Sequence, residues 1–264
     1  MIVDGKKIAH EIVEELFARR STLPPVLRIG VVMGGEDAAS ASFVKIKERV
    51  ADKLKVVVVR ELLNGASTTI QALRALGRLA KSTEGVIVQL PLPKHIDTNT
   101  VLAAIPASHD LDAVNPTATH PLVQAPVAEA IGEILSRYNI SAQNKNAVVV
   151  GAGRLVGAPA AALLRDVGAH VSVVTHGRGS LDELKSADIL VLGTGNPGII
   201  KPEMLKEDVV LIDAGTSEDS GRLAGDASPE CAEVASVFTP VPGGVGPIAV
   251  AMIFKNLFDL VGRT

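Results

Sequence analysis

The sequence predicts an α/β protein of two domains built on parallel sheets, and three observations support this prediction. First, apolar runs rich in β-branched residues alternate with segments of helical periodicity, the order that builds parallel sheets with helical crossovers. Second, a length of 264 residues allows one large domain or two modest ones. Third, the only aromatic residues are five Phe and one Tyr, so the core must consist of aliphatic side chains, as in buried parallel strands.

The first half of the chain alternates helices and strands. Apolar residues at helical spacing predict helices over 6–20, 39–54 and 68–81. Short β-rich runs predict strands over 27–34, 56–62 and 85–93, the last of which enters a proline-rich turn. Residues 106–126 contain four prolines and little periodicity, so they are predicted to form the loop region that ends the first domain.

The second half of the chain repeats this alternation. We expect a helix over 127–138, and then a strand, a glycine turn, a helix and a strand over 144–176. Further strands are expected in ADILVLGTG and DVVLIDAGTS, and an apolar helix over 247–262. The second half therefore looks like a dinucleotide-binding domain of Rossmann type.

Composition and charge narrow the function classes. The net charge of −3 gives no reason to expect a nucleic-acid partner. A single cysteine, Cys231, excludes a disulfide within the chain and fits a reducing compartment, which here means the cytoplasm. A catalytic thiol at Cys231 is the less favoured interpretation. No signal peptide, membrane span or metal site is expected.

A glycine turn over 151–157 predicts a phosphate-binding loop. Gly151, Gly153 and Gly157 form the pattern G-x-G-x-x-x-G between a strand and an Ala-rich helix. Glycines let the backbone turn sharply and approach a phosphate, while the helix start offers free N–H groups. Ala152 and Arg154 belong to the same candidate cofactor site. The alternative is a tight turn that binds no ligand.

The end of the next strand indicates which nicotinamide cofactor binds. An NAD site usually carries Asp or Glu there, whereas this chain has Thr175, His176 and Arg178. A cation suits a 2′-phosphate, so NADP is favoured over NAD, and Arg154 is a second candidate cation. The alternative is that these arginines are only solvated charges.

The predicted helix over 39–54 carries a candidate catalytic lysine. Phe43 and Lys47 stand four residues apart and share one helix face, which suits a flat substrate that needs proton transfer. By itself, Lys47 would be an ordinary solvated lysine. Gln89, at the carboxyl end of an apolar strand, and Asp112, in the HDLDAVN loop, favour a site, although Asp112 also fits a simple Asx turn.

Several motifs together resemble one family. The chain is similar to the bifunctional methylenetetrahydrofolate dehydrogenase/methenyltetrahydrofolate cyclohydrolases over nearly its whole length. The segments that carry the resemblance are DAASASFVKIK (37–47), VQLPLP (88–93), VVVGAGRLVGAP (148–159), ADILVLGTGNPGII (187–200) and TPVPGGVGPIAVAM (239–252). The last of these is the most specific signature.

The resemblance implies a domain organisation and two activities. It implies a folate-binding catalytic domain over 1–125 with the C-terminal helix 247–264, and a Rossmann NAD(P)-binding domain over 126–246, linked by the two long helices at 127–138 and 247–262. The enzyme would oxidise 5,10-methylenetetrahydrofolate to the methenyl form and hydrolyse that to 10-formyltetrahydrofolate, in one-carbon metabolism that feeds purine biosynthesis. A homodimer is also implied.

The resemblance assigns roles to particular residues. Lys47 would be the general acid/base of the hydrolysis, Gln89 would assist it, and Asp112 would anchor the pterin, all three being counted as catalytic. The remaining candidates are Phe43, Pro242, Gly243 and Gly244 for the substrate, and Thr194, Gly195 and Thr216 for the cofactor.

Several positions depart from the family pattern. The family's Tyr is Phe43 here, which keeps the aromatic face but lacks the hydroxyl near the lysine. Ala38 replaces a Pro, Ala113 replaces the Gly of D-V-D-G, and residues 125–128 read APVA instead of PCTP. Three alternatives therefore remain open: a dehydrogenase with weak or absent cyclohydrolase activity, a non-catalytic folate- or nucleotide-binding paralogue, and a shikimate-type dehydrogenase.

Overall fold

The computed structural model describes residues 1–34, 38–219 and 222–263, which belong to two compact units. The five-stranded unit comprises Met1–Ala9 and Val127–Ala249, and the three-stranded unit comprises His10–Pro126 and Val250–Thr264. The division between the units passes through helix α1 (Gly5–Arg19) and through helix α7 (Val245–Val261). Both of these helices therefore contribute residues to each unit.

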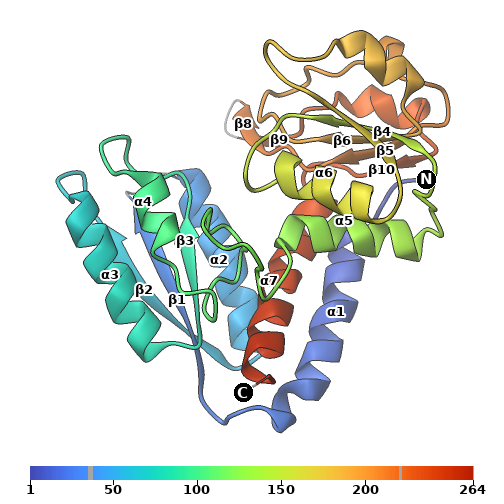
Figure 1. Ribbon diagram of the computed structural model, residues 1–264. Helices are drawn as coiled ribbons and strands as arrows, with labels where there is room; N and C mark the ends of the chain where they lie inside the picture. The colour runs from blue at the N-terminus through green and yellow to red at the C-terminus, as the bar shows by residue number, and fades with distance from the viewer. Residues whose placement is uncertain (35–37, 220–221, 264) are drawn as a thin grey trace. The chain divides into compact units, whose positions relative to one another are not determined.

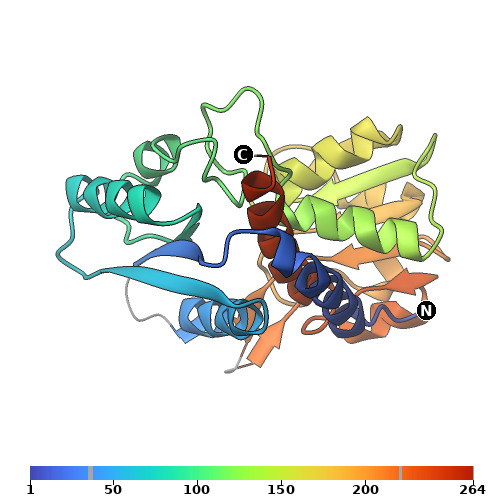
Figure 2. The same cartoon turned by 90° about the horizontal axis from the view of Figure 1, so that it is seen from below.

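A parallel sheet with strand order β2-β1-β3 lies at the centre of the three-stranded unit. Helices α2 and α3 cover its opposite faces (Figure 1, Figure 2). Because both faces are covered, β1 reads as a nearly continuous apolar run, LRIGVVMG. The elements after α1 are η1 (Arg20–Thr22), β1 (Leu27–Gly34), α2 (Ala38–Lys53), β2 (Val56–Leu63), α3 (Thr69–Ser82), β3 (Gly85–Gln89) and α4 (Thr98–Ala103).

Helix α3 illustrates how the local sequence builds this unit. Thr68 accepts a hydrogen bond from the backbone N–H of Gln71, and the Gln71 side chain accepts one from the backbone N–H of Thr68. This capping box fixes where the helix begins. Its buried residues recur at i, i+3, i+4 and i+7, so they form one apolar stripe against the sheet: Ala72, Ala75, Leu76 and Leu79.

The five-stranded unit contains a parallel sheet with strand order β10-β7-β6-β4-β5. The chain forms β4, adds β5 on one side, and then crosses to add β6, β7 and β10 on the other. The strand order therefore reverses between β4 and β6, the position at which open α/β sheets bind ligands. The elements are α5 (Pro126–Arg137), β4 (Asn146–Val150), α6 (Gly157–Asp166), β5 (His170–Val174), η2 (Leu181–Ser186), β6 (Ile189–Leu192), η3 (Pro202–Met204), β7 (Val210–Asp213), β8 (Ser217–Asp219), β9 (Arg222–Ala224), η4 (Pro229–Glu233) and β10 (Val237–Phe238).

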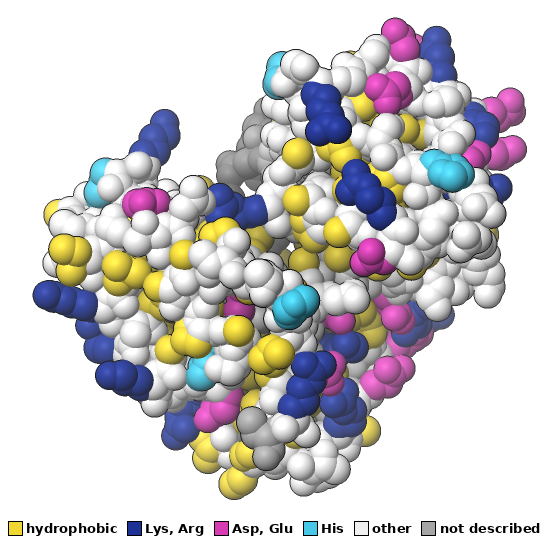
Figure 3. Space-filling model, viewed as in Figure 1, with side chains coloured by type: hydrophobic (Ala, Val, Ile, Leu, Met, Phe, Trp, Pro, Cys, Tyr) yellow, Lys and Arg dark blue, Asp and Glu magenta, His cyan; other side chains and the backbone are white. Residues whose placement is uncertain are grey.

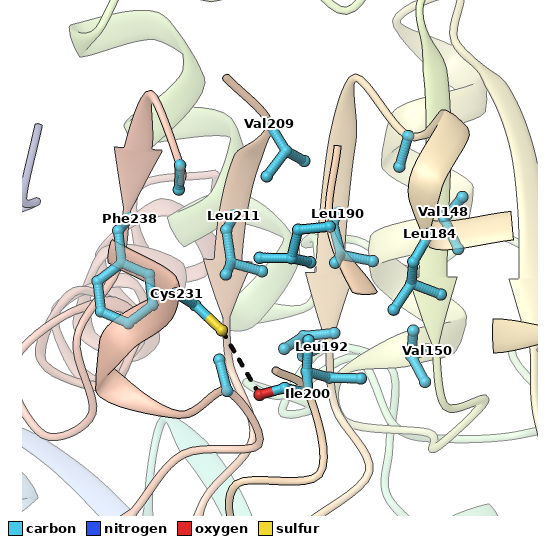
Figure 4. Close-up of a cluster of buried hydrophobic side chains, with 14 of the residues drawn as sticks. Val148, Val150, Leu184, Leu190, Leu192, Ile200, Val209, Leu211, Cys231 and Phe238 are labelled. Atoms are coloured by element: carbon cyan, nitrogen blue, oxygen red, sulfur yellow. Dashed lines mark hydrogen bonds between the residues drawn. The ribbon is translucent and has the colours of Figure 1, made fainter. Parts of the chain in front are cut away.

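One face of the five-stranded sheet carries a core of aliphatic side chains (Figure 4). Leu190 and Leu192 on β6, like Val148 and Val150 on β4, stand two residues apart and so point to the same face of the sheet. Cys231 lies in this core, where its Sγ donates to the Ile200 carbonyl at 3.5 Å. Burial raises the pKa of the Cys231 thiol, which favours a structural role for this residue over a catalytic one.

The helices and strands expected from the sequence are present, with shifts of a few residues at their ends. The strand expected over 85–93 ends at Gln89, because residues 90–93 form the proline-rich turn. The elements that the sequence did not predict are short: α4, the antiparallel strands β8 and β9, β10 and the 3₁₀ helices. The two-domain α/β prediction is confirmed.

The expected domain limits, 1–125 with 247–264 and 126–246, stay a prediction. Residues 1–9 group with the five-stranded unit, because Ile2 pairs with Phe238 and extends the β10 edge of that sheet. The boundary between the two units crosses helix α7 near its start, after Ala249. The linking role of two long helices stays a prediction.

The described surface carries both charge signs. On the face drawn in Figure 3, Lys and Arg side chains are interspersed with Asp and Glu. Within the described ranges, no helix combines the length and the apolar character that crossing a membrane requires. In the same part of the chain, no three His, Cys, Asp or Glu side chains are grouped as metal ligands would be.

Candidate active site

Lys47 and Gln89 meet at one end of the three-stranded sheet. Lys47 lies on α2, and Gln89 is the last residue of β3. The Lys47 Nζ donates a hydrogen bond of 2.8 Å to Gln89 Oε1, while Gln89 Nε2 donates to the Leu90 carbonyl at 3.0 Å. The Gln89 amide is therefore held by the backbone carbonyl of the next residue, and its oxygen faces the Lys47 ammonium group.

Asp112 comes to the same place because its loop runs beside β3. The backbone N–H of Val86 donates to the His109 carbonyl at 2.7 Å, and Asp110 forms a parallel bridge with Val86. Asp112, two residues further on, then follows the direction of β3 towards Gln89. This pairing could not be predicted, because the loop over 106–126 lacks strand periodicity.

The loop that carries Asp112 is held from two sides. Asn256 on α7, buried in the three-stranded unit, donates from Nδ2 to the Leu111 carbonyl at 3.0 Å and to the Gln124 carbonyl at 2.9 Å. The buried Asp110 carboxylate accepts from the backbone N–H of Asn115 at 2.8 Å. Neither supporting residue was among the predicted site residues, because hydrogen bonds to backbone groups leave no periodic pattern in the sequence.

Charge and burial shift the pKa values of both ionisable groups in the cluster. Burial lowers the pKa of Lys47, and the negative charge of Asp112 opposes that shift. Burial raises the pKa of Asp112 to about 6, with the Lys47 charge lowering it and the Asp110 charge raising it. The pKa of the lysine and that of the carboxyl are thus both shifted in the direction of neutral pH. Proton-transfer groups require pKa shifts in this direction.

The neighbours of Lys47 do not share its environment. Lys45 is exposed on the same helix, and Arg49 is exposed as well. The Phe43 backbone lies in α2, but its side chain lies outside the described residues. Lys47, Gln89 and Asp112 therefore form the described core of the candidate site, and we call these three residues the lysine cluster.

The candidate cofactor residues follow the carboxyl ends of strands in the five-stranded sheet. Gly151 follows β4 with a φ of +100°, which a side chain would strain. A Cβ at Gly157 would lie 2.1 Å from the Gly151 carbonyl oxygen, so helix α6 packs directly on the strand end. Ala152, Gly153 and Arg154 are exposed between them, and a Cβ at Gly153 would enter open space. This arrangement leaves room for a phosphate at the helix start.

The residues after β5 form a tight turn. Thr175 and Arg178 exchange two backbone hydrogen bonds, of 2.8 and 3.1 Å, around His176 and Gly177. His176 and Arg178 are exposed. The turn itself carries no carboxylate, in keeping with the preference for a 2′-phosphate inferred from the sequence.

The loops after β6 and β7 lie side by side. Thr194 and Gly195 follow β6, and Thr216 follows β7. A Cβ at Gly195 would lie 4.0 Å from the Thr216 carbonyl oxygen. The predicted cofactor residues thus lie at the carboxyl ends of the strands of one sheet, on both sides of the point where the strand order reverses.

The PVPGG segment forms a turn near the N-terminus. The backbone N–H of Gly244 donates to the Pro240 carbonyl at 2.7 Å, and Gly243 has a φ of +111°. Pro242 and Gly243 line a pocket of about 320 Å³, and the N-terminal residues Asp4 and Lys6 also line it. These two residues were not among the predicted site residues.

Two family models match the chain in succession. The catalytic domain of the tetrahydrofolate dehydrogenase/cyclohydrolases matches residues 3–112, and the NAD(P)-binding domain of the same family matches residues 125–264. The chain belongs to the tetrahydrofolate dehydrogenase/cyclohydrolase family. The lysine cluster lies within the first match and all predicted cofactor residues lie within the second. This membership decides against a shikimate-type dehydrogenase.

Relatives and solved structures of the family are similar over nearly their whole length. The bifunctional protein FolD of Halothermothrix orenii is 39% identical, and the match covers 97% of this chain and 95% of the relative. The Trypanosoma brucei dehydrogenase-cyclohydrolase, solved with NADP and an inhibitor, has a TM-score of 0.93 at 29% identity, covering 100% of this chain and 97% of that one. The Campylobacter jejuni bifunctional enzyme has a TM-score of 0.92 at 29% identity, covering 100% and 99%.

Proposed function

We propose that this protein oxidises 5,10-methylenetetrahydrofolate with NADP and then hydrolyses the 5,10-methenyl product to 10-formyltetrahydrofolate. The observation that carries the proposal is the hydrogen bond from Lys47 to Gln89 beside Asp112, within a chain that matches both domains of the family. The bifunctional relatives support the same pair of activities.

The hydrolytic step needs a proton carrier, and Lys47 suits it. Water adds to the methenyl carbon and loses one proton, which leaves a hydroxyl on that carbon. The hydroxyl then loses its own proton and becomes the formyl carbonyl as the bond from the carbon to one ring nitrogen breaks, and the freed nitrogen takes up one proton. The overall step consumes one water and releases one proton. Burial lowers the pKa of the Lys47 amine, so it gives up its proton more readily than an exposed lysine does. The Gln89 oxygen fixes where Nζ lies, and the Asp112 carboxylate accepts hydrogen bonds from N–H donors of a pterin.

The oxidation needs a bound nicotinamide, and the five-stranded unit fits NADP. When bound, NADP supplies the hydride acceptor. Gly151, Gly153 and the start of α6 suit its pyrophosphate, while Arg154 and Arg178 suit its 2′-phosphate. The Trypanosoma brucei relative was solved with NADP, which favours the same cofactor here.

A paired assay tests the proposed oxidation. Purified protein is given 5,10-methylenetetrahydrofolate with NADP or with NAD, and reduced cofactor is followed by absorbance. We expect turnover with both components and a higher kcat/KM for NADP. The exposed Arg165→Gln serves as the matched control for Arg154→Gln and Arg178→Gln, which should raise the KM for NADP but not for NAD. If neither NADP nor NAD supports turnover, the proposal is refuted.

The same preparation separates the bifunctional enzyme from a dehydrogenase alone. Phe43 lacks the hydroxyl that the family's Tyr would place near the lysine. Decay of methenyltetrahydrofolate is measured without NADP. A rate equal to the uncatalysed one would leave only the dehydrogenase, whereas binding without any turnover would indicate a non-catalytic paralogue.

We infer further that the protein acts in the cytoplasm as a homodimer. The single cysteine, buried in the core of the five-stranded unit, is compatible with a reducing compartment. Light scattering coupled to size-exclusion chromatography gives the molar mass in solution. A mass twice the 27.4 kDa of the chain is expected, and a monomer at micromolar concentration would overturn the dimer.

A further inference from the structure

Two buried carboxylates lie where the cofactor loops leave the five-stranded sheet. Asp213 is the last residue of β7 and is 1% exposed, and Asp226 is 0% exposed. Aspartate is rarely buried to this degree without specific partners. Neither residue belongs to the lysine cluster, which lies in the other unit, and neither was predicted from the sequence.

Asp226 binds the loop after β6. Its Oδ2 accepts the backbone N–H of Thr194 at 2.6 Å, and its Oδ1 accepts that of Asn196 at 2.9 Å. One carboxylate therefore holds two N–H groups, one on each side of Gly195, in the loop that carries two predicted cofactor residues. Hydrogen bonds to an ionised acceptor are shorter and stronger than neutral ones, so they fix the loop firmly.

Asp213 performs the equivalent task for the loops after β7 and β9. It accepts the backbone N–H of Gly215 at 2.9 Å and that of Ala227 at 2.8 Å. The two carboxylates approach glycines in a reciprocal way: a Cβ at Gly215 would lie 2.3 Å from the Asp226 Cγ, and a Cβ at Gly225 would lie 2.2 Å from Asp213 Oδ2. Any larger residue at either glycine would displace a carboxylate.

The loop after β6 also touches the phosphate-binding turn. A Cβ at Gly151 would lie 2.5 Å from the Gly193 carbonyl oxygen, and a Cβ at Gly193 would lie 2.4 Å from the Val156 side chain. Gly193 directly precedes Thr194, which Asp226 holds. A contiguous packed path thus runs from Asp226 through Gly193 to the turn at Gly151.

We propose that Asp226 is a positioning residue for NADP, which fixes the loop 193–196 and, through it, the phosphate-binding turn. This inference rests on the proposed function, since it requires that NADP is the ligand. Burial, together with the nearby Asp226 charge, raises the pKa of Asp213 to about 7.

The test compares Asp226, which binds the loop after β6, with Asp188, which directly precedes β6. Asp226→Asn keeps the size but sets an amide N–H against a backbone N–H of the loop. Asp188→Asn is the matched control, because Asp188 precedes β6 and accepts the backbone N–H of Asn146 at 3.0 Å, far from the cofactor loops. Binding of NADP is measured by titration calorimetry, which also gives the active fraction, alongside thermal unfolding without cofactor.

We expect Asp226→Asn to raise the Kd for NADP by about tenfold or more, as loss of a charge-assisted hydrogen bond implies. The Kd of Asp188→Asn and the NADP-independent hydrolysis of methenyltetrahydrofolate by both variants should stay as in the wild type. An unchanged Kd in Asp226→Asn overturns the inference, even if its unfolding temperature falls. If the wild type itself does not bind NADP, the proposed function fails instead.

A second pair of variants decides the matter if Asp226→Asn does not fold. Gly215→Ala displaces the Asp226 carboxylate without altering the loop 193–196 itself. Gly132→Ala is its control, since a Cβ there meets only an ordinary contact at 3.8 Å. A weaker NADP affinity in Gly215→Ala than in Gly132→Ala supports the positioning role, and equal affinities contradict it.

Discussion

Lys47 on α2 donates a 2.8 Å hydrogen bond to the side-chain oxygen of Gln89, the last residue of β3. The two residues are 42 positions apart in the sequence, and only the packing of α2 against the sheet brings them together. This contact fixes the position of the Lys47 ammonium group, and burial lowers its pKa.

Gln89→Glu should move the pH dependence of the hydrolysis. The change places a carboxylate oxygen where a neutral amide oxygen now accepts from Nζ, and an opposite charge at that distance raises the pKa of Lys47. We expect the limb of the pH–rate profile that reports Lys47 to shift upward by about one pH unit. Gln143→Glu, an exposed position in the other unit, makes the same charge change and should leave the profile as it is. Superimposable profiles for Gln89→Glu and wild type would contradict this account.

Asp112→Asn should flatten the dependence of stability on pH. Between pH 4 and 6 the unfolded carboxyl is ionised, while burial keeps the folded carboxyl protonated because its pKa is about 6. The folded chain then binds more protons, so the stability contributed by Asp112 is complete below pH 4 and is lost as the pH rises through 6. The loss amounts to roughly 3 kcal/mol.

Urea unfolding of wild type and Asp112→Asn at several pH values measures this contribution. All other carboxyl groups are shared by the two proteins, so the difference in their free energies of unfolding isolates Asp112. We expect the wild type to lose stability relative to the variant between pH 4 and 7. A difference that stays constant, or that changes in the opposite direction, would show that Asp112 is not held in a protonated form.

Ala113→Gly should stabilise the protein slightly. Ala113 has a φ of +51°, a left-handed conformation that costs a residue with a Cβ about 1–2 kcal/mol. Removing this strain stabilises the folded chain, but the greater conformational freedom of glycine stabilises the unfolded chain by about 0.4–1 kcal/mol. We therefore expect a net increase of about 0.5 kcal/mol in the free energy of unfolding. Ala104→Gly, at a φ of −88°, lacks the strain and should lose stability. Equal losses at both positions would refute the argument.

The sequence predicted the main helices and strands because their apolar patterns follow the periods of helix and strand. It also predicted that Lys47, Gln89 and Asp112 form one site, and the structure brings them together. Their catalytic roles stay predictions. Short elements such as α4, with six residues, were missed because they present too few turns for a pattern to emerge.

The residues that support the sites could not be predicted in the same way. Asn256 reaches Leu111 across 145 positions, and Asp226 reaches Thr194 across 32. Each forms its hydrogen bonds to backbone groups, which every residue carries, so the partner leaves no mark in the sequence. A polar residue in an otherwise apolar segment is the one sequence signal for such residues, as for Asn256 in α7.

The most direct test of the account is the rate of methenyltetrahydrofolate hydrolysis without NADP by wild type, Lys47→Met and Lys45→Met. Lys45 is exposed on the same helix and provides the matched control. Because general acid–base catalysis contributes about 100-fold or more, Lys47→Met should fall by at least that factor towards the uncatalysed rate, while Lys45→Met keeps the wild-type rate. A Lys47→Met protein as fast as the wild type, or a wild type no faster than the uncatalysed reaction, would contradict the account.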